Sequence, residues 1–313
     1  MRHKSSLLNK ITILATFLFL LMAMFFPVFT ESIAIWVVLV SVFLIGIPHG
    51  AIDHIMAAEI FGLNQTLKDH LLFYASYLLI MMLVGALWYF APVAGMILFL
   101  AISIYHFGQA DMEDFMVRKP GNWIWHNARG ILIIGLIVFV KPSVTYPIMA
   151  EAMRIDEAIF AGWMPDATIS AGIIITAYAL LAMIGYLLGR FKNPGRFFSD
   201  SLILAGLLII TGPLIGFALY FALWHSAGHI NEMREFFEGR DKSLSVLQFY
   251  KKATPFTLVS LFGLAFLAGI NSAFGLEEQF LSLMFILISV LTLPHMFIVD
   301  RMYAEKGASG VSQ

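Results

Sequence analysis

The sequence has no cysteine and little charge, and both absences limit what the protein can be. Of its 313 residues only 12% are charged, and the formal net charge is −1. A chain without cysteine cannot form disulfides, iron–sulfur clusters, thiolate-ligated haem or cysteine-type zinc sites. A water-soluble domain carries about twice this share of charged residues. The near-neutral balance also gives no support for binding to nucleic acid.

The chain is instead strongly apolar, with 60% hydrophobic residues and a mean hydropathy of +0.86. Its apolar runs are about 20 residues long, enough to cross the hydrocarbon core of a bilayer as helices. No alternation of period two indicates a β-barrel, and a helix satisfies its own backbone hydrogen bonds inside lipid. We therefore predict an all-α, polytopic transmembrane helix bundle that forms a single integral membrane domain over residues 1–313.

The expected number of spans is ten, and Lys and Arg set their orientation. The stretch 197–230 is long for one span and short for two, and Gly212 and Pro213 predict a break in its middle. With the N-terminus inside, nearly all Lys and Arg residues lie on the inner side, apart from Lys141 and Arg154. This favours the cell inner (plasma) membrane, with cytoplasmic N- and C-termini, and an outer loop at 141–166 with room for a short amphipathic helix. The predicted spans are 11–29, 32–48, 70–90, 92–107, 124–140, 167–189, 197–212, 213–230, 255–273 and 279–299.

Five histidines fall at the same predicted end of the spans: His49, His106, His225, His229 and His295. A histidine at a membrane interface can simply bond to headgroups and water, and each of these residues alone allows that interpretation. However, ionisable side chains within apolar segments are costly and usually functional. The i, i+4 spacing of His225 and His229 places both imidazoles on one face of a helix, where they can bind one metal ion from two sides. We hypothesise a shared metal site.

Several polar residues near these histidines are candidates for orienting them by hydrogen bonds. Asp53 is four residues after His49, and Asp111 is five residues after His106. Each aspartate can alternatively cap a helix in solvent. His54, five residues after His49, points away from it on a regular helix and cannot easily share its metal ion.

The type of metal remains open from the residues alone. All-nitrogen ligation suits Fe, Cu, Zn or Ni. The chain has no HExxH string, so a zincin-type protease is not expected. Membrane di-iron desaturases use more histidines, in HxxxH and HxxHH boxes, whereas this chain has one HxxxH and no HxxHH. A mononuclear site therefore fits better, although another membrane lipid oxygenase or desaturase stays an alternative.

A metal-ion transporter is the alternative of a different class. It predicts polar residues at the bilayer midplane and broken helices there. The predicted span centres are nearly all apolar, and Arg129, about one turn into its span, is the main exception. We expect Arg129 to pair with Asp111 or Asp53, or to extend to the interface.

Three strings carry a resemblance to a known family. The strings Gly46-Ile-Pro-His-Gly-Ala-Ile-Asp-His54, Tyr105-His-Phe-Gly-Gln-Ala-Asp111 and Trp224-His-Ser-Ala-Gly-His229 resemble the Brp/Blh family of microbial β-carotene 15,15′-dioxygenases. The resemblance spans the whole chain, with the strings in order and in similar spans.

The resemblance implies an enzyme that cleaves β-carotene centrally with O2 to two molecules of retinal, which a retinal-binding rhodopsin then uses. It implies a non-heme Fe(2+) cofactor. It also implies a substrate taken directly from the lipid bilayer, because β-carotene has no polar group. The ligands that it implies for the iron are His49, His106, His225 and His229. His54 and His295 also resemble family positions, and together with Asp53 and Asp111, which the spacing suggests, they are the residues expected behind those ligands.

Overall fold

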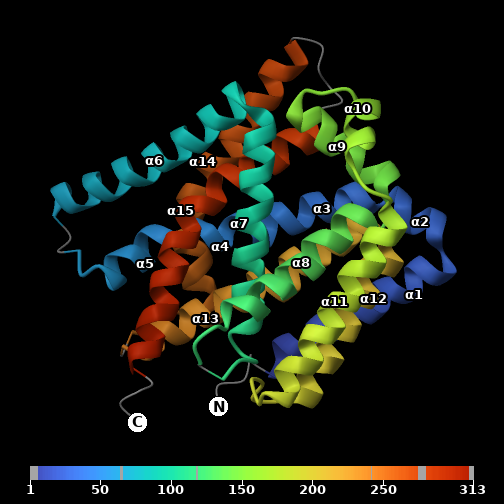
Figure 1. Ribbon diagram of the computed structural model, residues 1–313. Coiled ribbons are helices and arrows are strands. Elements are labelled where there is room, and N and C mark those ends of the chain that lie inside the picture. The colour runs from blue at the N-terminus through green and yellow to red at the C-terminus, as the bar shows by residue number, and fades with distance from the viewer. Residues whose placement is uncertain (1–5, 64–65, 118, 241, 274–279, 310–313) are drawn as a thin grey trace. The chain divides into compact units, whose positions relative to one another are not determined.

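The computed structural model describes residues 6–63, 66–117, 119–240, 242–273 and 280–309, and these are almost entirely helical (Figure 1). In this part of the chain the only β-structure is an isolated bridge between Met116 and Phe191. The predicted all-α fold is therefore confirmed.

The helices are α1 (Ser6–Phe25), α2 (Pro27–Ser32), α3 (Ala34–Ser41), η1 (Val42–Gly46), α4 (Ile47–Gly50), α5 (Asp53–Ile60), α6 (Leu67–Phe90), α7 (Pro92–Met112), α8 (Trp123–Phe139), α9 (Pro142–Met153), α10 (Glu157–Trp163), α11 (Ala167–Leu187), α12 (Pro194–Leu219), η2 (Tyr220–Ser226), α13 (Ala227–Glu238), α14 (Val246–Ala273) and α15 (Phe280–Ser309), where η1 and η2 are π-helical.

Many of these helices are long and apolar enough to cross a membrane. Large apolar side chains are exposed along them, for example Leu14 on α1, Leu83 on α6 and Ile173 on α11. A soluble monomer rarely exposes so much contiguous apolar surface, whereas lipid solvates it. The length and the exposed apolar side chains of these helices thus agree with the predicted transmembrane helix bundle.

The predicted count of ten spans is wrong. The described residues contain seven helices that pass as spans, or eight if the bent pair α8 and α9 is counted as one. One reason is that 197–212 and 213–230 lie in the continuous run Pro194–Glu238, which counts as one span although two helices meet in it at Gly212. The span expected at 255–273 lies in α14, where several side chains are outside the described residues.

The run Pro194–Glu238 is nevertheless broken where Gly212 and Pro213 predicted a break. Gly212 has φ 75° and ψ 178°, a conformation that only glycine adopts readily. A Cβ built on Gly216 would lie 3.2 Å from the Cα of Leu208, although residues eight apart on a straight helix are separated by about 12 Å. The chain therefore turns back on itself at Gly212.

The contacts divide the chain into two compact units. Unit 1 comprises Met1–Val42, Leu100–Glu151 and Ile155–Gly228, and unit 2 comprises Phe43–Phe99, Ala152–Arg154 and His229–Gln313. Four of the boundaries fall inside helices, at η1, α7, α9 and α13. The single domain predicted from the sequence stays a prediction.

In unit 1, helix α8 packs along α11 and α12, which lie beside it in Figure 1. An aromatic core closes one end of this group, with Trp125, Phe191 and Phe197 buried together. Trp125 also donates from Nε1 to the carbonyl oxygen of Leu181 at 3.0 Å. These contacts fix α8, which in turn positions α7.

In unit 2, helix α15 packs on α6 and α14, and α14 packs on α4. The core of this unit gathers side chains that are far apart in sequence, such as Met56, Phe249 and Met302, all nearly fully buried. Trp88 on α6 donates to Ser289 on α15 at 3.0 Å. The expected loop at 141–166, which extends over the unit boundary, holds the short helices α9 and α10.

Candidate functional site

Unit 1 brings two of the predicted ligands together. His106 lies on α7 and His225 in η2, and their ring centroids are 5.0 Å apart. Both side chains are buried. Phe107 lies 4.7 Å from the ring of His225, and Phe221 stacks on the same ring at 6.0 Å. The two imidazoles therefore stand in an aromatic, water-poor environment.

The helix that carries His106 approaches α8 unusually closely. A Cβ on Gly108 would lie 1.8 Å from the carbonyl oxygen of His126, and a Cβ on Gly130 would lie 1.7 Å from that of Ile104. Because real Cβ atoms cannot approach so closely, only glycine fits at these two positions. The glycine in the Tyr-His-Phe-Gly string is thus explained by helix packing.

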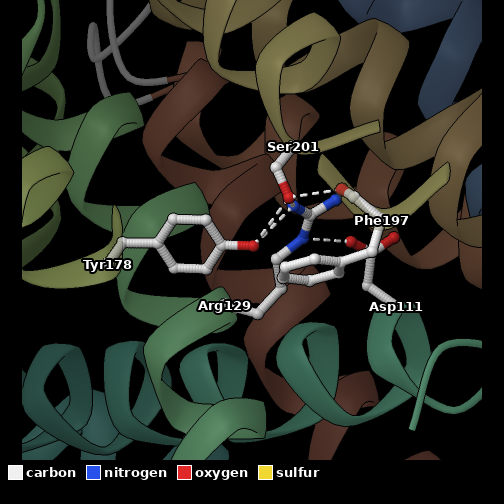
Figure 2. Close-up of polar contacts among 5 residues, drawn as sticks. All are labelled: Asp111, Arg129, Tyr178, Phe197 and Ser201. Carbon is white, nitrogen blue, oxygen red and sulfur yellow. Dashed lines mark hydrogen bonds and ion pairs between the residues drawn. The ribbon is translucent and has the colours of Figure 1, made fainter. Parts of the chain in front are cut away.

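A buried ion pair lies beside this crossing, as Figure 2 shows. The Nε of Arg129 donates to Asp111 at 2.5 Å, and its Nη1 donates to Tyr178 at 3.0 Å and to Ser201 at 2.8 Å. Arg129 is completely buried. The predicted pairing of Arg129 with Asp111 is confirmed. The network joins α7, α8, α11 and α12 and so fixes the position of the helix that bears His106.

Unit 2 brings together three further histidines. His49 on α4 lies 6.1 Å from His229 on α13 and 4.9 Å from His295 on α15, measured between ring centroids. His229 and His295 are 5.4 Å apart. All three are buried. His225 and His229 are four residues apart in the sequence but belong to different units. His225 lies close to His106 in unit 1, and His229 lies close to His49 and His295 in unit 2.

Oxygen acceptors form hydrogen bonds with the Nδ1 atoms of His49 and His295, and a carboxylate lies at an ion-pair distance from that of His229. His49 bonds to the carbonyl oxygen of Gly46, and His295 lies 2.8 Å from Oδ1 of Asp53. His229 lies 3.4 Å from the carboxylate of Glu232. Such contacts are typical of histidines that bind a metal through the opposite nitrogen.

The partner of Asp53 differs from the one that the spacing favoured. Its carboxylate accepts hydrogen bonds from His295 and from the hydroxyl of Tyr77, at 2.9 Å in the second case, whereas the sequence pointed to His49 four residues away. Asp53 opens α5, and the chain turns between α4 and α5 at residues 51–52. The i, i+4 argument assumed one continuous helix, so it does not apply here.

The remaining candidate, His54, lies among aromatic rings. Its ring centroid is 4.6 Å from that of Phe256 and 6.4 Å from that of Tyr74. Three residues that contact the histidines or their acidic partners were not predicted from the sequence: Tyr77, Glu232 and Tyr303. Glu232 is three residues after His229 and could have been found from that spacing, whereas the tyrosines are brought close only by packing.

The donor set suits a transition metal that prefers nitrogen. The described rings supply imidazole nitrogens, the ligand type that such a metal prefers. For a bond of about 2.1 Å to the nitrogen, the metal lies about 3.2 Å from each ring centroid, so two ligand rings lie about 4.5–6 Å apart. The pairs in both units fall near this range. In the described residues, however, no three His, Asp or Glu side chains form a ready metal-binding group; the rings would have to turn to bind an ion.

Known proteins resemble this chain over most of its length. A family model described as "Beta-carotene 15,15'-dioxygenase" matches residues 40–303. The "Probable beta-carotene 15,15'-dioxygenase Blh" of Halobacterium salinarum is 26% identical over 296 residues, covering 85% of this chain and 84% of that protein. The "Beta-carotene 15,15'-dioxygenase" of an uncultured marine bacterium, 66A03, is 27% identical over 294 residues, covering 86% and 94%. No solved structure matches the chain.

Proposed function

The chain belongs to the beta-carotene 15,15'-dioxygenase family, and on that basis we propose that it cleaves β-carotene with O2 at the central double bond to give two molecules of retinal. The cofactor in this proposal is a non-heme Fe(2+) ion bound by His49, His106, His225 and His229. The observation that carries the proposal is that the four buried imidazoles occur as close pairs, His106 with His225 in unit 1 and His49 with His229 in unit 2.

The residues of the chain have distinct tasks in this reaction. Four histidines without a carboxylate would leave the charge of a divalent ion uncompensated, and such an ion would supply the redox chemistry that O2 requires. Phe107 and Phe221, which contact His225, offer apolar ring faces on which a conjugated chain can pack. They also exclude water from the bond to be cleaved.

The membrane supplies the substrate in this proposal. β-Carotene is an apolar rod about as long as the hydrocarbon core is thick, roughly 30 Å, so it is found in the bilayer. We propose the cell inner membrane as the location, with both termini in the cytoplasm, because Arg2, Lys4 and Lys10 lie at the N-terminal end of the chain and Arg301 and Lys306 at its C-terminal end. Retinal would leave for a retinal-binding rhodopsin.

Expression in β-carotene-producing bacteria tests the activity. Cells with the unchanged chain should lose their orange colour and contain retinal. His106→Ala should abolish retinal formation and lower the iron content of the purified protein. His70→Ala, whose ring stacks on Tyr74, serves as the control and should remain active. Persistent pigment in cells that express the unchanged chain well would refute the proposal.

The amount of metal separates this proposal from its nearest alternative. One iron per chain is expected for a mononuclear dioxygenase. Two would favour a di-iron oxygenase or desaturase acting on another lipid.

A further inference from the structure

His295 is held by an aspartate in the manner of a metal ligand. Its Nδ1 lies 2.8 Å and 3.0 Å from the two carboxylate oxygens of Asp53. Because Nδ1–H donates to the carboxylate, the lone pair of the ring is on Nε2. Tyr77 donates a further hydrogen bond to Asp53 at 2.9 Å. The carboxylate is thus fixed from two sides, and it fixes the imidazole in turn.

The ring of His295 lies near two histidines of the proposed ligand set. It is 4.9 Å from His49 and 5.4 Å from His229 between ring centroids. Both distances lie within the range of about 4.5–6 Å expected for two imidazoles on one ion. His295 is closer to each of them than they are to one another, at 6.1 Å.

Two of the three rings, those of His49 and His295, share one pattern of hydrogen bonds. The Nδ1 of His49 bonds to a backbone carbonyl oxygen, and the Nδ1 of His229 faces Glu232, which accepts from Tyr303 at 2.7 Å. In His49 and His295 the Nδ1 atom forms a hydrogen bond to an oxygen, so that Nε2 is the atom suited to a metal, whereas at His229 the approach of Glu232 to 3.4 Å is an ion-pair distance. A histidine that served only as packing would not need to share this arrangement.

The sequence around His295 is weakly similar to the sequence around His49. Pro48-His49 and Pro294-His295 each follow an apolar stretch, and an aspartate follows each histidine a few residues later. The structure brings His49 and His295 from these two strings together within unit 2. The two similar strings thus place their histidines next to each other.

We propose that His295 is a further ligand of the metal ion, beside His49 and His229, and that Asp53 is the carboxylate that orients it. This inference rests on the proposed function, since it adds an imidazole to the metal centre assigned there. Asp53 acts as a positioning residue because it contacts His295 and not the metal.

Metal binding by the purified full-length chain tests this inference. Variants His295→Ala and Asp53→Asn are compared with the unchanged chain and with His70→Ala. Each is titrated with Fe(II) without oxygen, and with Co(II), whose visible absorption reports the number and kind of ligands. His295→Ala should bind Fe(II) more weakly and change the Co(II) spectrum. Asp53→Asn should lower the affinity about 10–100-fold, the usual effect of losing such a carboxylate. His70→Ala should match the unchanged chain in both readouts.

A rescue experiment covers the case in which the alanine variant folds poorly. His295→Gly leaves space for free imidazole, and adding imidazole should restore the Co(II) spectrum. Tyr77→Phe should weaken binding less than Asp53→Asn, because it removes only the outer hydrogen bond.

The outcomes separate this inference from the proposed function. If the unchanged chain binds no iron, the proposed metal centre fails. If His49→Ala loses the metal while His295→Ala keeps the affinity and the Co(II) spectrum of the unchanged chain, only the inference about His295 is overturned.

Discussion

Replacing Arg129 by Met should destabilise the protein strongly. Arg129 is completely buried, and the side chain of its partner Asp111 is 5% exposed. Removing the arginine leaves a buried carboxylate without its counter-charge, which costs about 3–5 kcal/mol in proteins where such pairs have been broken. The hydrogen bonds to Tyr178 and Ser201 are lost as well, at about 1 kcal/mol each.

A double replacement gives the sharper test of this reasoning. Asp111→Leu alone leaves the arginine unpaired and should cost a similar amount. Arg129→Met with Asp111→Leu removes both charges, so the cost should be well below the sum of the two single replacements. The difference measures the penalty for an unpaired buried charge.

The assay is unfolding by a denaturing detergent in mixed micelles, followed by tryptophan fluorescence. The chain has six tryptophans, and thiol-reactive dyes are unsuitable because it has no cysteine. The control is Lys141→Met. Its pair with Glu31, at 2.6 Å, is exposed on both sides, so its loss should cost under about 1 kcal/mol. If Arg129→Met costs no more than Lys141→Met, or if the two single effects simply add, the reasoning is wrong.

Three further outcomes are expected. Gly130→Ala should cost about 1–3 kcal/mol because its Cβ would overlap the carbonyl oxygen of Ile104, whereas Gly172→Ala, with open space, should be neutral or stabilising in the same unfolding assay. Gly212→Ala should also cost about 1–3 kcal/mol through its backbone conformation, and Gly206→Ala on the same helix should not; equal effects would contradict this account of the break. Removing metal with a strong iron chelator should stop retinal formation, and Fe(II) but not Zn(II) should restore it, as retinal measured by chromatography would show.

Hydropathy predicted the helical membrane fold because the length of an apolar run is a direct property of the sequence. It could not predict the number of separate spans. Whether a helix continues through 194–238 depends on a local turn at Gly212, and the run there is apolar on both sides. Hydropathy is likewise insensitive to a π-helical turn, so η1 and η2 were not expected.

For the candidate site, local spacing predicted some partners and missed others. The buried charge of Arg129 needed an acid, and Asp111 was one of the two considered. For Asp53 the same reasoning chose a neighbour in sequence, although its contact His295 is 242 residues away. That contact depends on the packing of α15 in unit 2, which no spacing rule contains. The complete ligand set likewise stays a prediction.

The two π-helical segments have a consequence for how the histidines point. Val42–Gly46 directly precedes the short helix of His49, and Tyr220–Ser226 contains His225. A π turn holds one residue more than an α turn. Shortening either segment by one residue, so that it became α-helical, would rotate the downstream helix by about 100° relative to the upstream helix. The direction of each imidazole is thus set by a local change in winding that leaves the string of amino acids around the histidine intact.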